Sequence, residues 1–424
     1  MRKALPASLV LAALISALGF TLAEEPGKQS PLEFQAGEGK IRFYGFLRLD
    51  VQYDDSKPND PQVIAWIRSE DDTAPVSAIV ARPNDDQLNL HAKLSRLGMD
   101  IGSYTVPKLG GAKVSGKLEI DFFNTSTSES REALRIRHAY LELAWKHTAL
   151  LFGQTVDVIS PLIPAVNADF SMWNAGNLAD RRPQIRFTYS PKIGESGTFI
   201  LQAAVGMTGA VDNQTLDASP AGTSVVSNLD GVDSGRPTTQ LRLAYNGGSW
   251  VKEKKFEVGV WGHAASEELS QGAAPINGHS DWDSHAIGLG LKLPIAKRLD
   301  FEGEIWEGKN LDDVRGGIGQ GVNVTAGDPH LGEEIESSGG WAQLGVTACD
   351  WFLVYLGYST DNPEDGLPAV SARDLNSVWY LATRFKPTAN LTFGLDYLNW
   401  TTEWTGGLND GTDNRYNFFA QWNF

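Results

Sequence analysis

The chain has 424 residues, of which 52 are acidic and 36 basic, and its formal net charge is -16 at pH 7. This excess of negative charge argues against a nucleic-acid partner. The single cysteine, Cys349, excludes an internal disulfide bond. The 44 glycines, 13 tryptophans and 18 phenylalanines suit twisted strands with aromatic girdles better than a helical core.

Residues 1–23 have the layout of a secretory signal peptide. Arg2 and Lys3 precede an apolar stretch, and the small residue Ala23 stands at the expected cleavage position. This stretch is too short for a stable membrane helix, and no later stretch reaches the roughly 18 uncharged apolar residues that a spanning helix needs. The exported protein is therefore either soluble or a membrane barrel.

Apolar and polar residues alternate from residue 41 onward. In 41–53 the odd positions are apolar or glycine, while Arg42, Arg48 and Asp50 are among the residues between them. One face of such a strand suits lipid or a core, and the other suits water. The same pattern returns in later segments, near 114–122, 184–189, 240–245, 256–263, 287–293, 301–305, 391–397 and 414–424. A soluble β-sandwich would not usually sustain this alternation for so long.

The connectors between these segments alternate between long and short. Long polar connectors lie near 54–88, 125–133, 156–182, 209–237, 267–282, 310–337, 361–375 and 403–413. Short connectors lie near 104–112, 146–148, 191–197, 247–254, 296–298, 349–350 and 387–390. Long loops at one rim and tight turns at the other are typical of outer-membrane barrels.

We therefore predict an all-β fold, a transmembrane antiparallel β-barrel of about sixteen strands, which falls in the porin size range. The barrel is expected to cover 40–424, after the signal peptide and a short periplasmic segment over 24–39. The segments 90–101 and 134–145 change parity partway, which predicts β-bulges or displaced strand ends.

The last strand carries aromatic residues at alternate positions, including Tyr416, Phe418 and Trp422, and the sequence ends on Phe424. This pattern resembles the assembly signal of bacterial outer-membrane proteins. An ordinary edge strand is the alternative interpretation. The pattern favours the bacterial outer membrane as the location.

Residues 156–182 show neither a helical nor an alternating period. An irregular connector of this length inside a compact domain is usually functional or a sign that the neighbouring elements are misread. Its apolar residues need partners, and they are Ile159, Leu162, Ile163, Phe170, Met172 and Trp173. Inside a barrel, this loop could fold back into the lumen and narrow the channel. It follows the fifth counted strand, where the eyelet loop of porins lies.

Several segments of the first half resemble the DcaP-like trimeric porins of Gram-negative bacteria. They are FYGFLRLD (43–50), SRLGMDI (95–101), SGKLEIDFF (115–123), LRIRHAYLELAW (134–145), LLFGQT (150–155) and RRPQIRFTY (181–189). The resemblance implies a sixteen-stranded homotrimer in outer-membrane lipid and lipopolysaccharide. It also implies a third extracellular loop that constricts the pore, and passive diffusion of small hydrophilic solutes with a preference for small anions such as dicarboxylates. The coiled-coil extension that often precedes the barrel in that family is missing here, so no role of that extension is carried over.

Arginines on the polar strand faces are expected to point into the lumen. A lysine or arginine on the lipid face at the midplane would cost roughly 2 to 4 kcal/mol. The predicted pore-lining or substrate-binding residues are Arg48, Arg96, Arg135, Arg137, Arg181, Arg182, Arg186, Asp50, Asp157, Asp169 and Trp173.

Two hypotheses fit these charges. In the first, the arginines draw anionic solutes through the narrowing, because the arginine fork binds carboxylates with two hydrogen bonds. In the second, they pair with nearby acids, including Asp157, Asp169 and Asp180, and hold the loop against the wall. The resulting transverse field would orient dipolar solutes in a cation-preferring or non-selective porin. The charges alone do not decide between these hypotheses, and the family resemblance favours anions.

No metal site or cofactor is expected. The aspartates in 230–235 and 409–414 lack the spaced ligands of a dedicated Ca²⁺ site and suit polar turns, and no two histidines have metal-ligand spacing. An outer-membrane enzyme such as a lipid hydrolase is the alternative function. It would need a nucleophile and a base in register on the wall, and no Gly-x-Ser-x-Gly motif is present. A purely structural barrel would be expected to have a packed lumen.

Overall fold

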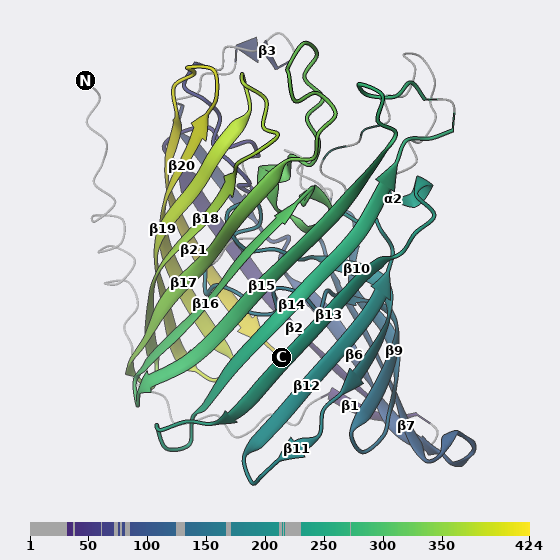
Figure 1. Cartoon of the computed structure of the whole chain (residues 1–424). Coiled ribbons are helices and arrows are strands. Elements are labelled where there is room, and N and C mark those ends of the chain that lie inside the picture. Colours follow the sequence, from purple (N-terminus) through teal and green to yellow (C-terminus); the bar gives the residue numbers. More distant parts are fainter. Residues whose placement is uncertain are drawn as a thin grey trace. The chain divides into compact units, whose positions relative to one another are not determined.

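The strands of the computed structural model follow one another around a closed antiparallel barrel (Figure 1). The structure describes residues 32–36, 39–60, 62–71, 75–76, 79–80, 85–123, 132–166, 171–211, 214, 216, 230–271 and 273–424. The predicted signal peptide lies outside the described residues. Among the residues described, no helix is long and apolar enough to cross a membrane.

Sixteen strands make up the barrel, and each pairs with the next one along the chain. They are β2 (Gly39–Asp54), β6 (Arg96–Val106), β7 (Ala112–Asp121), β8 (Arg135–Ala144), β9 (Thr148–Val156), β10 (Arg181–Tyr189), β12 (Gly197–Gly206), β13 (Thr238–Gly248), β14 (Lys255–Glu268), β15 (Asp281–Ala296), β16 (Leu299–Lys309), β17 (Glu336–Cys349), β18 (Phe352–Pro363), β19 (Arg373–Thr388), β20 (Leu391–Trp404) and β21 (Gly411–Asn423). Strand β2 closes the barrel, because residues 41–46 pair with β6 while residues 46–53 pair with β21. The predicted fold class is confirmed.

The structure also contains shorter strands and helices outside the sixteen barrel strands. They are β1 (Leu32–Ala36), β3 (Pro75–Val76), β4 (Ile79–Val80), β5 (Gln87–His91), β11 (Lys192–Ile193), α2 (Asp230–Asp233), η1 (Pro107–Leu109), η2 (Asp312–Val314) and η3 (Gly317–Gly319). Strand β1 falls within the segment that was expected to precede the barrel, and it pairs antiparallel with the start of β2. The described part of that segment is therefore strand, joined to the barrel.

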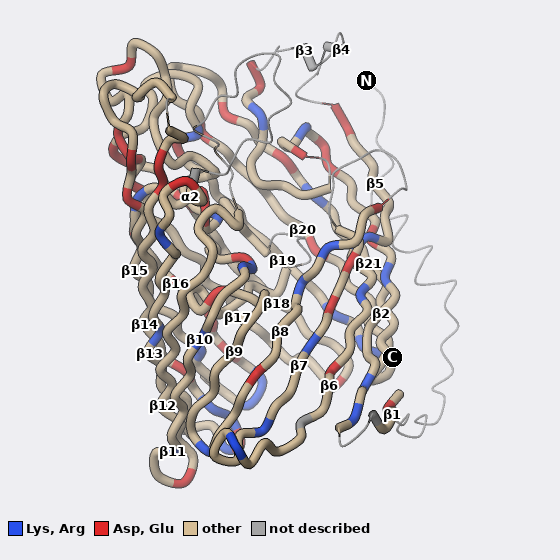
Figure 2. Tube along the Cα trace, turned by 90° about the vertical axis from the view of Figure 1, so that its right-hand side faces the viewer, with Lys and Arg blue, Asp and Glu red and all other residues tan. Residues whose placement is uncertain are grey.

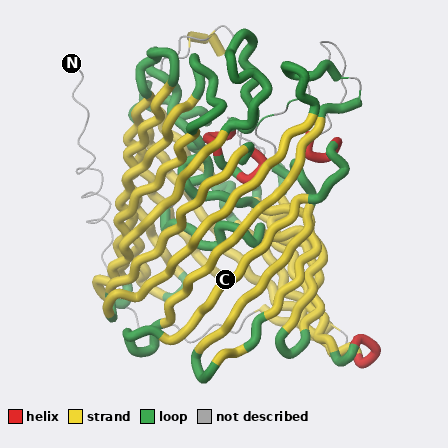
Figure 3. Tube along the Cα trace, viewed as in Figure 1, coloured by secondary structure: helices red, strands yellow, loops and turns green. Residues whose placement is uncertain are grey.

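Connector lengths alternate as predicted, with long loops at one rim and short turns at the other (Figure 3). The short turns include residues 297–298 between β15 and β16 and residues 350–351 between β17 and β18. The long connectors include residues 310–335 between β16 and β17. This asymmetry is that of an outer-membrane barrel.

The two faces of the barrel wall differ in polarity. Large apolar side chains are exposed on the outer face, such as Leu47 (54 %), Ile287 (59 %) and Ile305 (63 %). On the inner face, polar residues such as Ser284 of β15 and Asp396 of β20 are buried. A wall that shows apolar residues outward and polar residues inward matches lipid on one side and water on the other.

A β-bulge explains the parity change predicted in 134–145. Glu119 of β7 pairs with His138 of β8, and Ile120 pairs with Ile136, so Arg137 has no partner across the ladder. The extra residue lets both Arg137 and His138 turn toward Glu119, with Arg137 Nε 2.8 Å from Glu119 Oε1. A second register shift lies between Ile101 and Tyr104. The bulge thus places two adjacent side chains on the lumenal side.

A charge on the outer face should destabilise the barrel. Replacing Ile305, in the middle of β16, with arginine is expected to lower the free energy of unfolding by about 2 to 4 kcal/mol, because the guanidinium would have to enter lipid. Urea titration of protein refolded in lipid vesicles measures this change. Ser115→Arg is the matched control, because Ser115 stands opposite Glu142 on the inner side of β7 and β8. Equal losses in both variants would contradict the assignment of the outer face.

Candidate functional site in the barrel lumen

The described parts of the connector between β9 and β10, residues 157–166 and 171–180, fold into the barrel, and we call this connector the constriction loop. Its backbone is hydrogen-bonded to the inner wall on several strands. Val158 N donates to Gln240 Oε1 of β13 at 3.0 Å, and Ala165 N donates to Gln343 Oε1 of β17 at 2.9 Å. The indole of Trp306, on β16, donates to Gly176 O at 2.8 Å. The inward-folded loop predicted from the sequence is confirmed.

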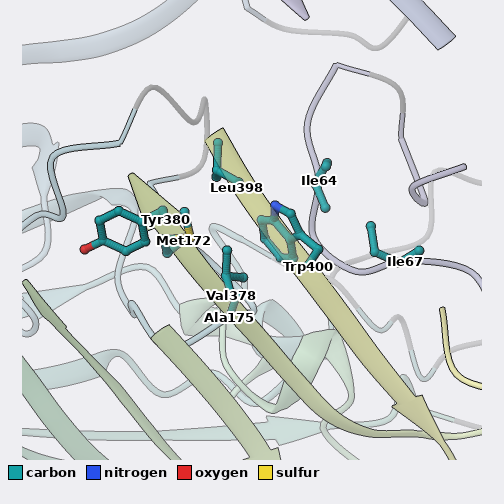
Figure 4. Packing of buried hydrophobic residues seen from close by; sticks show 8 residues of the cluster. All are labelled: Ile64, Ile67, Met172, Ala175, Val378, Tyr380, Leu398 and Trp400. Carbon is teal, nitrogen blue, oxygen red and sulfur yellow. The ribbon is translucent and has the colours of Figure 1, made fainter. Parts of the chain in front are cut away.

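Apolar residues of the constriction loop find their partners on the inner wall. Met172 and Ala175 pack with Val378, Tyr380, Leu398 and Trp400 of β19 and β20, and with Ile64 and Ile67 of the loop after β2 (Figure 4). A second cluster contains Ile159, Leu178 and Ala179 with Trp261, Ala286, Trp306, Leu311 and Val314. Each fully buried large apolar side chain contributes about 1.5 to 3 kcal/mol, so these contacts hold the loop against β14 to β20.

Ile163 of the loop does not follow this pattern. Ile163 is 60 % exposed, so it does not find the packing partner expected from the sequence. Phe170 lies outside the described residues.

A buried ion pair closes the base of the constriction loop. Arg182 Nε lies 2.6 Å from Asp157 Oδ1, and Arg182 Nη2 lies 3.2 Å from Asp157 Oδ2. The same carboxylate accepts Asp180 N at 3.0 Å, while Asp157 N donates to Asp180 O at 2.9 Å. The remaining arginine donors reach Met207 O and Thr238 Oγ1, as well as the backbone oxygen of Asp313. The two ends of the loop are therefore joined to each other and to two outer loops.

The constriction loop packs against the wall formed by the later strands. It leaves the inner face of β6 to β8 open to the lumen. Three arginines line this face, and we call them the basic wall: Arg96, Arg135 and Arg137. Arg135 Nη2 lies 2.7 Å from Asp121 Oδ2, and Arg96 Nη1 lies 3.4 Å from Glu119 Oε1. Figure 2 shows basic positions recurring along these strands.

Exposure within the basic wall is unequal between the two signs of charge. The arginine side chains are 11 to 25 % exposed, whereas Glu119 is 7 % exposed and Asp121 is fully covered. The guanidinium groups therefore stand between their carboxylate partners and the lumen. The more accessible charge of the basic wall is therefore positive.

A cavity of about 350 Å³ lies between the constriction loop and the wall. Its lining residues are Arg48, Ala165, Val166, Tyr355, Arg384, Lys386, Thr392, Phe419 and Gln421. Ala165 and Val166 belong to the loop, and the others belong to β2, β18, β19, β20 and β21. Two arginines and one lysine line this cavity, and none of its lining residues is acidic.

The two arginines of the cavity are each held by a carboxylate beneath them. Arg48 Nη2 lies 2.8 Å from Asp50 Oδ1, and Arg384 forms an ion pair with Asp396. Both carboxylate side chains are fully covered, while both arginines remain partly exposed. Arg384 also donates to Ala165 O, so it fixes the wall to the loop.

Six of the predicted arginines lie on or near the lumenal surface. Arg48 lines the cavity and three others form the basic wall, as described above. Arg186, on β10, donates to Gln184 Oε1 at 3.0 Å and to Val156 O. It forms no ion pair with any residue that the structure describes. Arg181 lies 3.3 Å from Asp180 Oδ1, a carboxylate that Arg315 shares at 2.7 Å.

Four other predicted residues are buried behind the lumenal surface, contrary to the expectation that they line the path. Arg182 and Asp157 bind each other in the ion pair at the base of the loop, and Asp50 is buried beneath Arg48, with which it forms an ion pair. Trp173 is 7 % exposed, with the Arg315 guanidinium 5.0 Å from its ring centre. The ion pairs of Arg182 with Asp157 and of Arg48 with Asp50 are of the kind that the pairing hypothesis describes. Asp169 lies outside the described residues.

The sequence prediction omits residues that the structure places at the constriction. Lys386 stands at an even position of β19, the parity of the buried Val378 and Tyr380, so the inward alternation that places Arg384 in the lumen could have identified it too. Tyr355 and Gln421 could be found in the same way on their strands. Arg315 follows the short helix η2 in an irregular loop, where no period predicts its position.

A closed sixteen-stranded barrel with a loop folded into a polar, charged lumen defines the class of protein, an outer-membrane porin. Residues 17–219 match the model of the DcaP outer membrane protein family. This match confirms the resemblance found in the sequence. No curated protein sequence matches the chain.

Solved structures of outer-membrane channels share this fold. The outer membrane channel DcaP of Acinetobacter baumannii superposes with a TM-score of 0.68 at 20% identity, covering 92% of this chain and 99% of that one. An anion-selective porin from Comamonas acidovorans has a TM-score of 0.55 at 13% identity, covering 91% and 100%. OmpF of Salmonella typhi has a TM-score of 0.57 at 11% identity, covering 93% and 100%.

Loosening the constriction loop should widen the channel. Gly176 has a φ of 109°, and a Cβ there would lie 2.3 Å from Gly340 O, so Gly176→Ala adds both backbone strain and a clash. We expect a loss of about 1 to 3 kcal/mol in loop docking and a larger, noisier single-channel conductance in planar bilayers. Gly194→Ala, at a φ of 61° with open space around it, should leave conductance unchanged. An unaltered current in Gly176→Ala would show that the loop does not limit the pore.

Proposed function

We propose that this porin is a water-filled channel for the passive diffusion of small hydrophilic solutes, and that it favours small anions such as dicarboxylates. The observation that carries the proposal is the unequal exposure of the paired charges. At the cavity and along the basic wall, guanidinium groups face the water and their carboxylates lie behind them. Each pair then acts as a dipole whose positive end points into the lumen.

The distance between a solute and each protein charge decides which charge interacts with the solute more strongly. The Coulomb energy falls inversely with separation, and at about 4 Å near a protein surface it is on the order of 4 kcal/mol. An anion touching a guanidinium is several ångströms farther from the buried carboxylate, which it cannot approach. Lys386 adds an uncompensated charge, since it is exposed and forms no ion pair with the residues described. The local balance is therefore positive despite the acidic total.

The arrangement of the cavity supports a solute with two carboxylates. The guanidinium groups of Arg48 and Arg384 lie 3.9 and 5.1 Å from the centre of the Phe419 ring, which makes them close neighbours. The forks of Arg48 and Arg384 already donate to Asp50 and Asp396, so both groups would attract a solute carboxylate through their positive charge. Lys386, Thr392 and Gln421 supply further polar contacts in the same cavity. Because Ala165 borders this space, the position of the constriction loop sets its width.

We assign the pore-lining role to Arg48, Arg96, Arg135, Arg137, Arg181 and Arg186 from the predicted set, together with Arg384 and Lys386. The buried members of that set support these residues from behind. Arg182 and Asp157 hold the base of the loop, and Asp50 orients Arg48.

The assembly is proposed to be a homotrimer in outer-membrane lipid, with lipopolysaccharide around its outer end. The exposed apolar outer face supports the lipid contact. OmpT of Vibrio cholerae, which has the same fold at 14% identity and a TM-score of 0.52, has been solved in a trimer form. Cross-linking of the purified protein in detergent tests the oligomeric state.

Reversal potentials in a planar bilayer under a KCl gradient test the anion preference. We expect the wild type to be anion-selective and Lys386→Gln to lower the chloride-to-potassium permeability ratio about twofold or more, because an uncompensated cation is lost from the narrowing. The double variant Arg384→Gln/Asp396→Asn should act in the same direction. Removing both partners avoids leaving a buried carboxylate unpaired, which costs about 3 to 5 kcal/mol.

The control variant is Lys252→Gln, since Lys252 is 93% exposed in a short turn outside the lumen. A cation-selective wild type whose permeability ratio is the same in all variants would end the anion proposal and leave the porin assignment intact. Hydrolysis of lipid by the purified protein, without conductance, would instead favour an outer-membrane enzyme.

A further inference from the structure

Three carboxylates meet at the rim that carries the long loops. Glu267 stands at the end of β14, and Asp312 and Asp313 form most of the short helix η2. All three residues are at most 2% exposed. One oxygen from each carboxylate can be chosen such that the three lie within 4.8 Å of one another. Carboxylates this close repel one another, and taking each from water costs several kcal/mol.

Backbone amides are among the groups that hold these carboxylates in place. Asp313 Oδ2 accepts Gly209 N at 2.7 Å, and Asp312 Oδ2 accepts Gln214 N at 3.1 Å. Arg182 is a neighbour that reaches the backbone oxygen of Asp313, but its fork is bound to Asp157. These hydrogen bonds fix the geometry of the cluster.

Asn310 provides an independent sign of a bound cation. Its side chain is fully buried, and its Nδ2 donates to Glu267 Oε2 at 2.9 Å. Its Oδ1 has no hydrogen-bond partner among the residues that the structure describes. A Cβ added to Gly321 would lie 2.2 Å from this oxygen and 2.3 Å from Asp312 Oδ1. The two acceptor oxygens are therefore neighbours beside Gly321.

Turning the Asn310 amide over does not remove the conflict. Its NH₂ group would then face Asp312, but its oxygen would face the Glu267 carboxylate. In either orientation an amide oxygen meets a carboxylate oxygen, and neither group can donate if the acids are ionised. A cation among these oxygens would satisfy both.

We propose that Glu267, Asn310, Asp312 and Asp313 form a binding site for a divalent cation of the Ca²⁺ class. All donors are oxygens, and three of the four groups carry a negative charge, which is the ligand set that Ca²⁺ prefers. Histidine and cysteine, the usual ligands of Zn²⁺ and Cu²⁺, do not belong to the cluster. This site does not include the aspartates of 230–235 and 409–414, which the sequence analysis considered as Ca²⁺ ligands.

The cation would brace three outer segments that meet at this point. They are the connector after β12, the end of β14 and the connector after β16. Leu311 and Val314 of the last segment pack with Ile159 and Leu178 of the constriction loop. The site is therefore one packing layer away from the loop, and binding would stiffen the support on which the loop rests.

Calorimetric titration of the full-length protein in detergent, stripped with EGTA, tests the site with CaCl₂ as the probe. We expect the wild type to bind one Ca²⁺ per chain and to melt at a higher temperature with Ca²⁺ than without it. Asp312→Asn should weaken the affinity by at least about tenfold and abolish the thermal shift, because it removes a charged ligand. The variant amide oxygen can still accept the hydrogen bond from Gln214 N.

The matched control is Glu333→Gln, an exposed acid of the same connector, which should bind Ca²⁺ as the wild type does. Glu267→Gln is the second test variant and removes a ligand from a different strand. The proposal fails if the wild type binds no Ca²⁺ up to about 10 mM, well above the range of extracellular sites. It also fails if both ligand variants bind as tightly as the wild type. A higher melting temperature of Asp312→Asn than of wild type, with no Ca²⁺ response in either, would show that protons neutralise the cluster.

Discussion

The interior of this barrel depends on the buried ion pair between Arg182 and Asp157. The arginine is the second residue of strand β10 and the aspartate is the first residue of the constriction loop, so the pair ties the loop to the strand that follows it. The remaining arginine donors bind two outer segments. Breaking a buried pair by removing one partner costs about 3 to 5 kcal/mol, because the other charge stays uncompensated. The Arg182 side chain therefore helps to position the constriction loop, the barrel wall and the outer segments relative to one another.

Apolar packing supplies the rest of the force that holds the loop inside. An apolar loop gains no stability from contact with water. The inner wall of β14 to β20, however, carries tryptophan, tyrosine and leucine side chains where the loop can pack on them. The loop covers this apolar sector and leaves the arginine-bearing sector open. The barrel lumen thus has a packed sector and a charged sector.

Most of the architecture followed from the sequence. Alternation with a period of two, and connectors that alternate in length, predicted the barrel, its strand number and the inward loop, because lipid and water impose those patterns on every strand. The parity change in 134–145 even indicated the bulge at Arg137. Alternation also gives the side of the wall that a residue faces. It does not give the residue's depth behind its neighbours, which is why Arg182 and Trp173 were expected at the surface of the path.

The sequence by itself determined the class of this protein, since the choice between lipid and water is made residue by residue along each strand. Only the tertiary structure decided which charges are presented to a solute. Asp50 and Asp396 are hidden beneath Arg48 and Arg384, and that order depends on side-chain packing between strands distant in the sequence. The cluster of Glu267 with Asp312 and Asp313 likewise exists only in the folded chain, because barrel closure and loop packing bring these residues together.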